Sequence, residues 1–136
     1  MQENEDPTFV APLLLINRTH VPRTRNRRFE LSINMWSRSS GDVGTQALID
    51  SGAEDNFIDN LFVEQMGFET MMLEEPLKVF NVDGTANKVG TITEFVRVLL
   101  EVQGHQQRVD LLVTGLGRNK VLLGMPWLED TNPDIN

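Results

Sequence analysis

Alternating apolar and polar residues predict that most of the chain forms short β-strands. Residues 29–35 alternate strictly, which is the pattern of a strand with one buried face. The stretch 37–44 is rich in Ser and Gly and is expected to form a loop that turns the chain back into a second strand, 45–50. These two strands predict a hairpin whose end carries Asp50.

The apolar spacing changes after this hairpin and predicts a helix of about three turns. Asp55 or Asn56 is expected to cap its first turn, and Gly67 is expected to end it. The apolar positions of this helix are Phe57, Ile58, Leu61, Phe62 and Met66.

Strand patterning resumes after the helix and continues almost to the end of the chain. Asp83-Gly84 is a strong hairpin signal between two apolar runs. A closing helix is expected over 125–130, with Trp127 as a core anchor. The expected strands are 77–82, 89–102, 108–114 and 121–123, with turns at 103–105 and 115–117. Many short strands and little helix predict an all-β domain, folded as a closed or nearly closed barrel.

The composition narrows the chemistry that the chain can perform. There is no cysteine, which excludes disulfides, thiolate catalysis and zinc–thiolate sites. His20 and His105 are too few and too far apart in sequence to indicate a metal site, so neither a metal nor a cofactor is expected. The apolar stretch Phe9–Ile16 is much shorter than the roughly 20 residues that span a bilayer. We therefore expect no membrane insertion, and a cytoplasmic location.

The charges are unevenly distributed along the chain. Residues 1–28 carry five Arg and three acidic side chains, whereas residues 29–136 carry seven basic and seventeen acidic ones. We interpret 1–28 as an Arg-rich, partly disordered linker and 29–136 as the folded domain. The acidic body disfavours nucleic acid, so that any contact with it would come at most from the segment Arg18–Arg28.

Three motifs follow one another along the chain, and their order is more specific than any one of them. Asp-Ser-Gly alone is usually an ordinary turn. The motifs are Leu48-Ile49-Asp50-Ser51-Gly52-Ala53, then Val79-Phe80-Asn81-Val82-Asp83-Gly84-Thr85, then Leu123-Gly124-Met125-Pro126-Trp127-Leu128 with Asn132-Pro133-Asp134-Ile135. Together they resemble the retropepsin family of aspartic proteases, and most of all the protease of gypsy-type LTR retrotransposon polyproteins. The resemblance implies a retropepsin-like closed β-barrel, the acid protease fold, with one or two short helices.

The resemblance also implies how the chain acts. Pepsin-like enzymes carry two Asp-Thr/Ser-Gly turns, whereas this chain has one, so two copies must meet as a symmetric homodimer. The two Asp50 carboxyls would share one proton. The ionised carboxylate would take a proton from a water, and the protonated one would donate to the scissile carbonyl. The catalytic residues implied by the family are Asp50, Ser51 and Gly52.

Further residues are implied to bind an extended polypeptide substrate. They belong to the floor of the cleft and to a hairpin flap that closes over it. For Leu48 and Leu122, plain core packing is an equal alternative. The implied substrate-binding residues are Leu48, Ala53, Glu54, Asp55, Phe80, Asn81, Val82, Asp83, Gly84 and Leu122. Glu54 stands where many gypsy-type sequences have Thr, and Met125 stands where the retroviral branch has an Arg.

The function implied is that of an aspartic endopeptidase that processes its own Gag-Pol-type polyprotein, in the cytoplasm or within virus-like particles. The alternative is a catalytically silent retropepsin-fold module that dimerises or binds peptides. The intact Asp-Ser-Gly sequence favours the enzyme.

Overall fold

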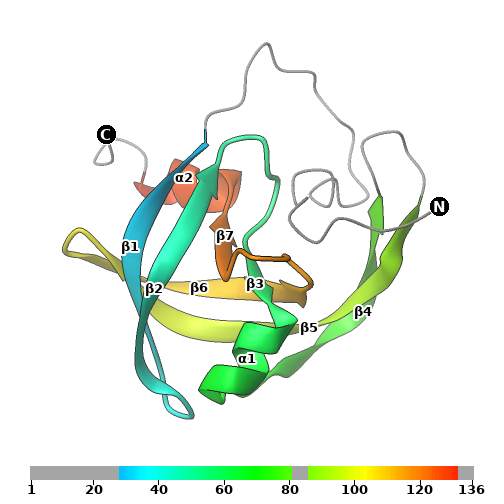
Figure 1. The fold of residues 1–136 in the computed structure, drawn as a ribbon, viewed down its shortest axis with the longest axis horizontal. Helices are drawn as coiled ribbons and strands as arrows, with labels where there is room; N and C mark the ends of the chain where they lie inside the picture. The colour runs from blue at the N-terminus through cyan, green and yellow to red at the C-terminus, as the bar shows by residue number, and fades with distance from the viewer. Residues whose placement is uncertain (1–27, 81–85, 132–136) are drawn as a thin grey trace.

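A computed structural model describes residues 28–80 and 86–131 of the chain (Figure 1). Seven strands and two short helices make up this part. They are β1 (Arg28–Ser37), β2 (Gly41–Asp50), β3 (Phe57–Asp59), α1 (Asn60–Met66), β4 (Met71–Phe80), β5 (Ala86–Val102), β6 (His105–Thr114), β7 (Val121–Leu123) and α2 (Met125–Thr131). The predicted predominance of β-structure is confirmed.

Six of the strands close into a barrel. The strands are hydrogen-bonded in the order β1-β2-β7-β3-β6-β5-β4, and an additional pairing of β1 with β5 completes the ring. β2–β7 and β3–β6 are parallel pairs, so the barrel is mixed. β4 pairs with β5 outside this ring. The closed barrel with two short helices confirms the predicted fold class.

The first hairpin is longer than the sequence pattern suggested. β1 and β2 pair over their full lengths, and the turn occupies only residues 38–40, so the expectation of a loop over 37–44 was wrong. The backbone N–H of Ser40 donates to Ser37 Oγ at 3.1 Å, and Gly41 has φ of 70°. Because the Ser37 hydroxyl and Gly41 complete a tight turn, the following residues are free to pair with β1.

The helix α1 begins later in the chain than the sequence pattern suggested. Residues Phe57–Asp59 form β3, which pairs with β6 on one side and β7 on the other and is fully buried. The cap is Asp59, whose Oδ2 accepts from the N–H of Phe62 at 3.2 Å, and not Asp55 or Asn56. The helix then has seven residues and ends at Gly67, as predicted. A short apolar run does not distinguish a buried strand from a helical turn by its spacing.

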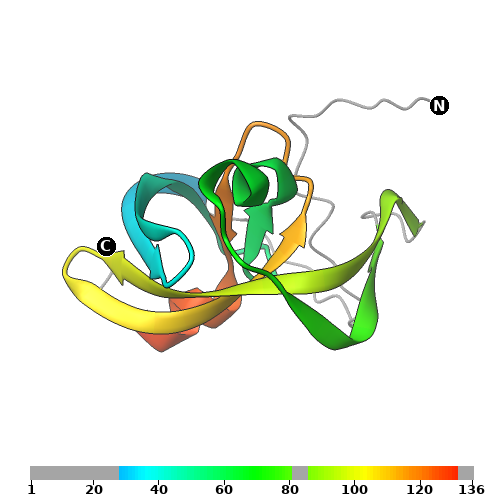
Figure 2. The ribbon, with the colours of Figure 1, turned by 90° about the horizontal axis from the view of Figure 1, so that it is seen from below.

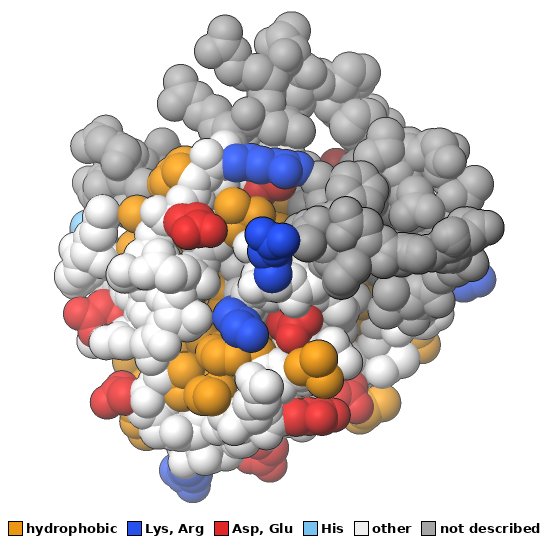
Figure 3. Space-filling model, viewed as in Figure 1, with side chains coloured by type: hydrophobic (Ala, Val, Ile, Leu, Met, Phe, Trp, Pro, Cys, Tyr) orange, Lys and Arg blue, Asp and Glu red, His pale blue; other side chains and the backbone are white. Residues whose placement is uncertain are grey.

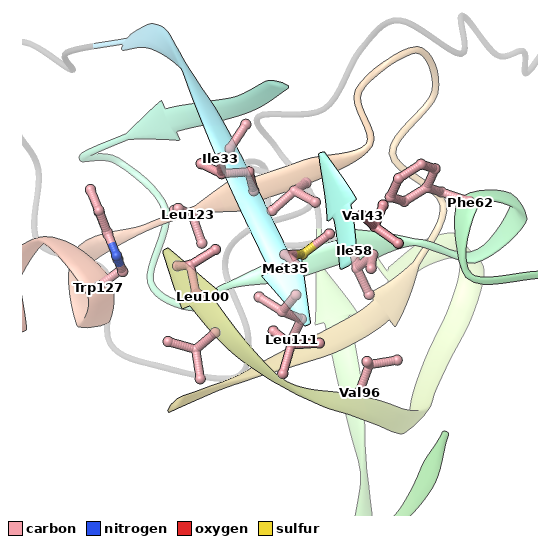
Figure 4. Packing of buried hydrophobic residues seen from close by; sticks show 14 of the residues in the cluster. Ile33, Met35, Val43, Ile58, Phe62, Val96, Leu100, Leu111, Leu123 and Trp127 are labelled. Atoms are coloured by element: carbon pink, nitrogen blue, oxygen red, sulfur yellow. The ribbon is translucent and has the colours of Figure 1, made fainter. Parts of the chain in front are cut away.

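The interior of the barrel is filled by one large apolar cluster (Figure 4). Its side chains come from β1, β2, β3, α1, β5, β6, β7 and α2, and the sticks in Figure 4 converge between the strands. Trp127 on α2 is 1% exposed, which confirms that it is a core residue. The second, smaller cluster consists of Ala53, Phe57, Ile92, Leu112, Leu116 and Leu122.

β4 and the first part of β5 form an extension of the barrel, because β5 pairs with β6 only from Phe95 onward. In Figures 1 and 2 this two-stranded ribbon projects from the body of the molecule. Both strands start earlier than the apolar pattern indicated, and β4 has a register irregularity between Met72 and Leu77. The predicted turn at Asp83-Gly84 lies outside the described residues. At the other end of β5, the turn at Gln103 and Gly104 is confirmed.

Replacing Trp127 by Ala is expected to lower the free energy of unfolding by about 3 to 5 kcal/mol, because it empties a large fully buried site. Trp36 is the matched control, since it is 47% exposed on β1, and its replacement by Ala should cost less than about 1 kcal/mol. Urea unfolding followed by circular dichroism measures both. Equal losses in the two variants would contradict this account of the core.

Candidate active site

Asp50 is the last residue of β2, a strand that is paired on both sides. On one side, Arg28 of β1 pairs with Asp50. On the other side, Leu123 of β7 pairs with Ile49, the residue before Asp50. Only 2% of the Asp50 side chain is exposed. The backbone at Asp50 is therefore fixed by two neighbouring strands, β1 and β7.

The turn that follows is held by its own hydrogen bonds. Asp50 Oδ1 accepts from the backbone N–H of Gly52 at 2.8 Å, and the Asp50 carbonyl accepts from the N–H of Ala53 at 3.0 Å. Ser51 and Gly52 are half-buried and Ala53 is buried. These bonds orient the carboxylate and leave Oδ2 as the oxygen that does not bind the turn.

The first residue of α2 and the glycine before it contact the backbone of this turn. The N–H of Met125 donates to the Ala53 carbonyl at 2.9 Å. A Cβ at Gly124 would lie 2.5 Å from the carbonyl oxygen of Asp55 and 2.6 Å from that of Ala53. The first and third sequence motifs are thus in direct contact, and only glycine allows this approach.

Asn56 completes the support and was missed as a site residue by the sequence analysis. Its Oδ1 accepts from the N–H of Gly124 at 2.9 Å, and its carbonyl accepts from the N–H of Leu112 at 2.9 Å. The residue is buried. The sequence suggested Asn56 only as a helix cap, because its actual partners lie far away along the chain.

Arg28 contacts the Asp50 carboxylate directly. Its Nε lies 3.3 Å from Asp50 Oδ2, and 45% of the Arg28 side chain is exposed. The sequence analysis placed Arg28 in the Arg-rich segment, whereas the structure makes it the first residue of β1. The signal that could have found it is the antiparallel register of the hairpin, which sets Arg28 opposite Asp50.

The structure brings some of the predicted substrate-binding residues together. Ala53 and Leu122 belong to the smaller apolar cluster, against which Leu48 and Leu77 pack. Leu122 is completely buried, whereas Leu48 is half-buried. The floor of the site and the base of the β4–β5 ribbon therefore share one apolar cluster.

The remaining predicted residues are only partly described. Glu54 and Asp55 follow the turn and are half-buried. Phe80 is the last residue of β4, and its side chain is not described. Asn81, Val82, Asp83 and Gly84 lie outside the described residues.

Charged side chains of both signs lie on the described surface outside the Asp50 turn (Figure 3). On the face in Figure 3, acidic and basic side chains are both scattered. On the outer face of β5 and β6, Asp110 binds Arg97 through two hydrogen bonds of 2.8 and 3.1 Å, and its carboxylate raises the pKa of the Arg97 guanidinium. Most of the Arg18–Arg28 segment lies outside the described residues, so a nucleic-acid contact there stays a prediction.

Among residues 28–80 and 86–131, no group of three His, Cys, Asp or Glu side chains could hold a metal ion. None of the helices in these ranges is long and apolar enough to cross a membrane.

A model of the PEG10/RTL1 protease domain matches residues 46–136. The chain belongs to this family. The PEG10/RTL1 protease domain is a retropepsin-like domain of retrotransposon-derived proteins, and retropepsin-like domains work as dimers. The matched region includes Asp50, the β4–β5 ribbon and Gly124. Family membership therefore assigns this chain to the retropepsin-like aspartic proteases.

Replacing Gly124 by Ala is expected to disturb the Asp50 turn, because the added methyl group would overlap two backbone carbonyl oxygens. We expect a loss of stability of about 1 to 3 kcal/mol, measured by thermal unfolding. Gly115→Ala is the matched control, since its Cβ would meet only Asn60 Oδ1 at 3.8 Å. A Gly124→Ala protein as stable as the Gly115→Ala protein would show that the close approach is not needed.

Proposed function

We propose that this protein is an aspartic endopeptidase that acts as a homodimer, with one Asp50 from each subunit. The observation that carries the proposal is the Asp50 turn itself, in which one carboxylate oxygen is bound by Gly52 and the turn is supported by Gly124. Membership of the PEG10/RTL1 protease domain family supports the same chemistry.

The reaction needs two carboxyl groups because one group cannot act as base and acid in the same step. In the dimer, the two Asp50 side chains lie close together and hold one proton between them. The ionised carboxylate removes a proton from a bridging water, which attacks the scissile carbonyl carbon. The protonated carboxyl donates to the carbonyl oxygen. No covalent intermediate with the enzyme forms.

The groups around Asp50 have supporting roles in this scheme. The Gly52 N–H binds Oδ1 of Asp50 at 2.8 Å and so fixes the orientation in which the carboxyl meets the water and the second carboxyl. Ser51 braces the two turns against each other across the dimer. Gly52 and Ala53 are small and let the substrate backbone lie close to the catalytic oxygens.

The substrate is an extended polypeptide that lies between this floor and the β4–β5 ribbon. Extended peptides need hydrogen-bond partners along both edges, and a hairpin that closes over the cleft supplies one of them. Apolar side chains beside the scissile bond would contact Leu48 and the cluster that contains Leu77 and Leu122. Glu54 and Asp55, together with the ribbon residues 80–84, contact the substrate in this proposal.

We further propose that the substrate is the polyprotein of a gypsy-type retroelement from which this domain derives. The three motifs and their order support this origin. The alternative function, a silent module that dimerises or binds peptides, predicts binding of such a polyprotein without cleavage.

Asp50→Asn should retain the fold and lower cleavage at least about a thousandfold, because the amide cannot carry the shared proton. Asp42→Asn is the matched control, since Asp42 is an exposed acid near the start of the same strand. Both proteins are incubated with a polyprotein fragment at about pH 4 to 7, with and without a pepstatin-type inhibitor. Equal turnover by wild type and Asp50→Asn would refute the enzymatic function. Binding without cleavage by either protein would favour the silent module.

A further inference from the structure

A groove lies on the outer surface of the barrel, at the end of the β1–β2 hairpin that is away from Asp50. Its volume is about 440 Å³, within the roughly 300 to 1,000 Å³ typical of ligand pockets. Its residues come from the end of β1 and the turn after it, the start of β4 and the residue Glu69 before it, and β5 and β6. The length of the hairpin, about 30 Å, separates this surface from the Asp50 turn (Figure 1). We call it the Trp36 groove, and it is not part of the proposed catalytic cleft.

Three large apolar side chains line the Trp36 groove, and all three are exposed to solvent. Trp36 is 47% exposed, Met71 is 43% exposed and Leu99 is 38% exposed. Trp36 of β1 pairs directly with Leu99 of β5, so these two side chains lie next to each other on the same face of the sheet. Adjoining exposed apolar side chains of this size are typical of a surface that binds another molecule.

The charged residues of the Trp36 groove are mainly cations. Arg38, Arg97 and Arg108 line it together with one acid, Glu69, whereas the whole chain has 12 Lys and Arg against 20 Asp and Glu. Arg97 is already bound by Asp110 through two hydrogen bonds. Within the described ranges, neither Arg38 nor Arg108 forms an ion pair. Two guanidinium groups beside the apolar side chains can therefore bind the carboxylates of another molecule.

The backbone around the Trp36 groove is held by hydrogen bonds. The N–H of Glu69 donates to Ser39 Oγ at 2.9 Å, which joins the β1–β2 turn to the segment before β4. Within the turn, Ser37 Oγ accepts from the N–H of Ser40 at 3.1 Å and lies 2.7 Å from Ser40 Oγ. Because these contacts exist within the single chain, a bound molecule would meet a preformed surface and lose little affinity to ordering of the backbone.

We propose that the Trp36 groove binds an acidic segment of a partner protein. A large apolar side chain of that segment packs against Trp36, and the acidic residues beside it bind Arg38 and Arg108. The complementary charges and the apolar lining together specify this chemistry. The groove lies about 30 Å from Asp50 along the hairpin, so the binding does not depend on the proposed proteolysis.

The groove favours an acidic peptide over single-stranded nucleic acid, which also binds aromatic and basic side chains. Met71 and Leu99 have aliphatic side chains, so Trp36 is the one lining residue on which a base could stack. The carboxylate of Glu69 repels phosphates, whereas it can accept hydrogen bonds from the backbone N–H groups of a peptide. A phosphodiester backbone has no such donor.

Fluorescence anisotropy of a labelled peptide, titrated with the full 136-residue chain, tests the proposal. The acidic probe is a fluorescein-labelled peptide with phenylalanine and leucine between glutamates, and the comparison peptide has serines in place of the glutamates. We expect the acidic peptide to bind at least about tenfold more tightly than the serine peptide, because the guanidinium groups bind its carboxylates. Raising the salt concentration from about 50 mM to about 500 mM should reduce this difference.

Variants of the groove locate the binding. Trp36→Ala, and the double change Arg38→Gln with Arg108→Gln, should each weaken binding of the acidic peptide at least about tenfold. All three residues are exposed, so these variants are expected to keep the fold. The matched controls are Leu61→Ala and Arg118→Gln, which change an exposed apolar residue and an exposed arginine outside the groove and should bind as wild type does.

Equal binding of the two peptides, or unchanged binding of the acidic peptide by Trp36→Ala, would overturn the proposal. Tighter, Trp36-dependent binding of a labelled oligothymidylate would also overturn it and would assign the groove to nucleic acid. A dimer that weakens in Trp36→Ala would assign the groove to a second copy instead. None of these measurements uses proteolysis. A chain that never cleaves, but binds the acidic peptide through Trp36, would refute the proposed enzyme and still support this binding surface.

Discussion

The close packing of Gly124 against the backbone of Ala53 and Asp55 is the constraint on which the site depends. A side chain at this position would overlap two carbonyl oxygens. Because glycine has none, the end of β7 can lie directly beneath the Asp50 turn. The hydrogen bonds from Gly124 N–H to Asn56 and from Met125 N–H to Ala53 then join the two segments. Two segments more than 60 positions apart in the sequence thereby hold the Asp50 turn together.

The barrel gives this support its rigidity. β2 is paired with β1 and β7, and β3 is inserted between β6 and β7, so the segments on either side of the turn are both held in the sheet. The large apolar cluster fills the interior, and α2 covers it with Trp127. A carboxylate at the end of such a strand has little freedom to move.

Much of this arrangement could be predicted from the sequence because it depends on local patterns. The alternation in residues 29–35 identified β1, and the position of Gly67 identified the end of α1. The order of the three motifs suggested the retropepsin-like fold, which the closed barrel bears out. Asp50 was singled out by the same motifs, and its role in catalysis stays a prediction.

Other features depend on contacts between distant residues and have no local signal. β3 was mistaken for part of a helix, because its three residues are buried by β6 and β7 and carry no period of their own. Asn56 was interpreted as a cap, although its side chain binds Gly124. The contact of Arg28 with Asp50 follows from the hairpin register, which the predicted loop over 37–44 had obscured.

The central claim is that each catalytic site uses one Asp50 from each of two chains. Mixing the wild-type and Asp50→Asn proteins in equal amounts, above the dimer dissociation constant, tests it most directly. If both carboxyls are required, only pairs of wild-type chains cleave, and the mixture retains about one quarter of the activity of the same total amount of wild type. A mixture that retains about one half, with activity proportional to the wild-type fraction at every ratio, would show that one chain is sufficient and would contradict the account.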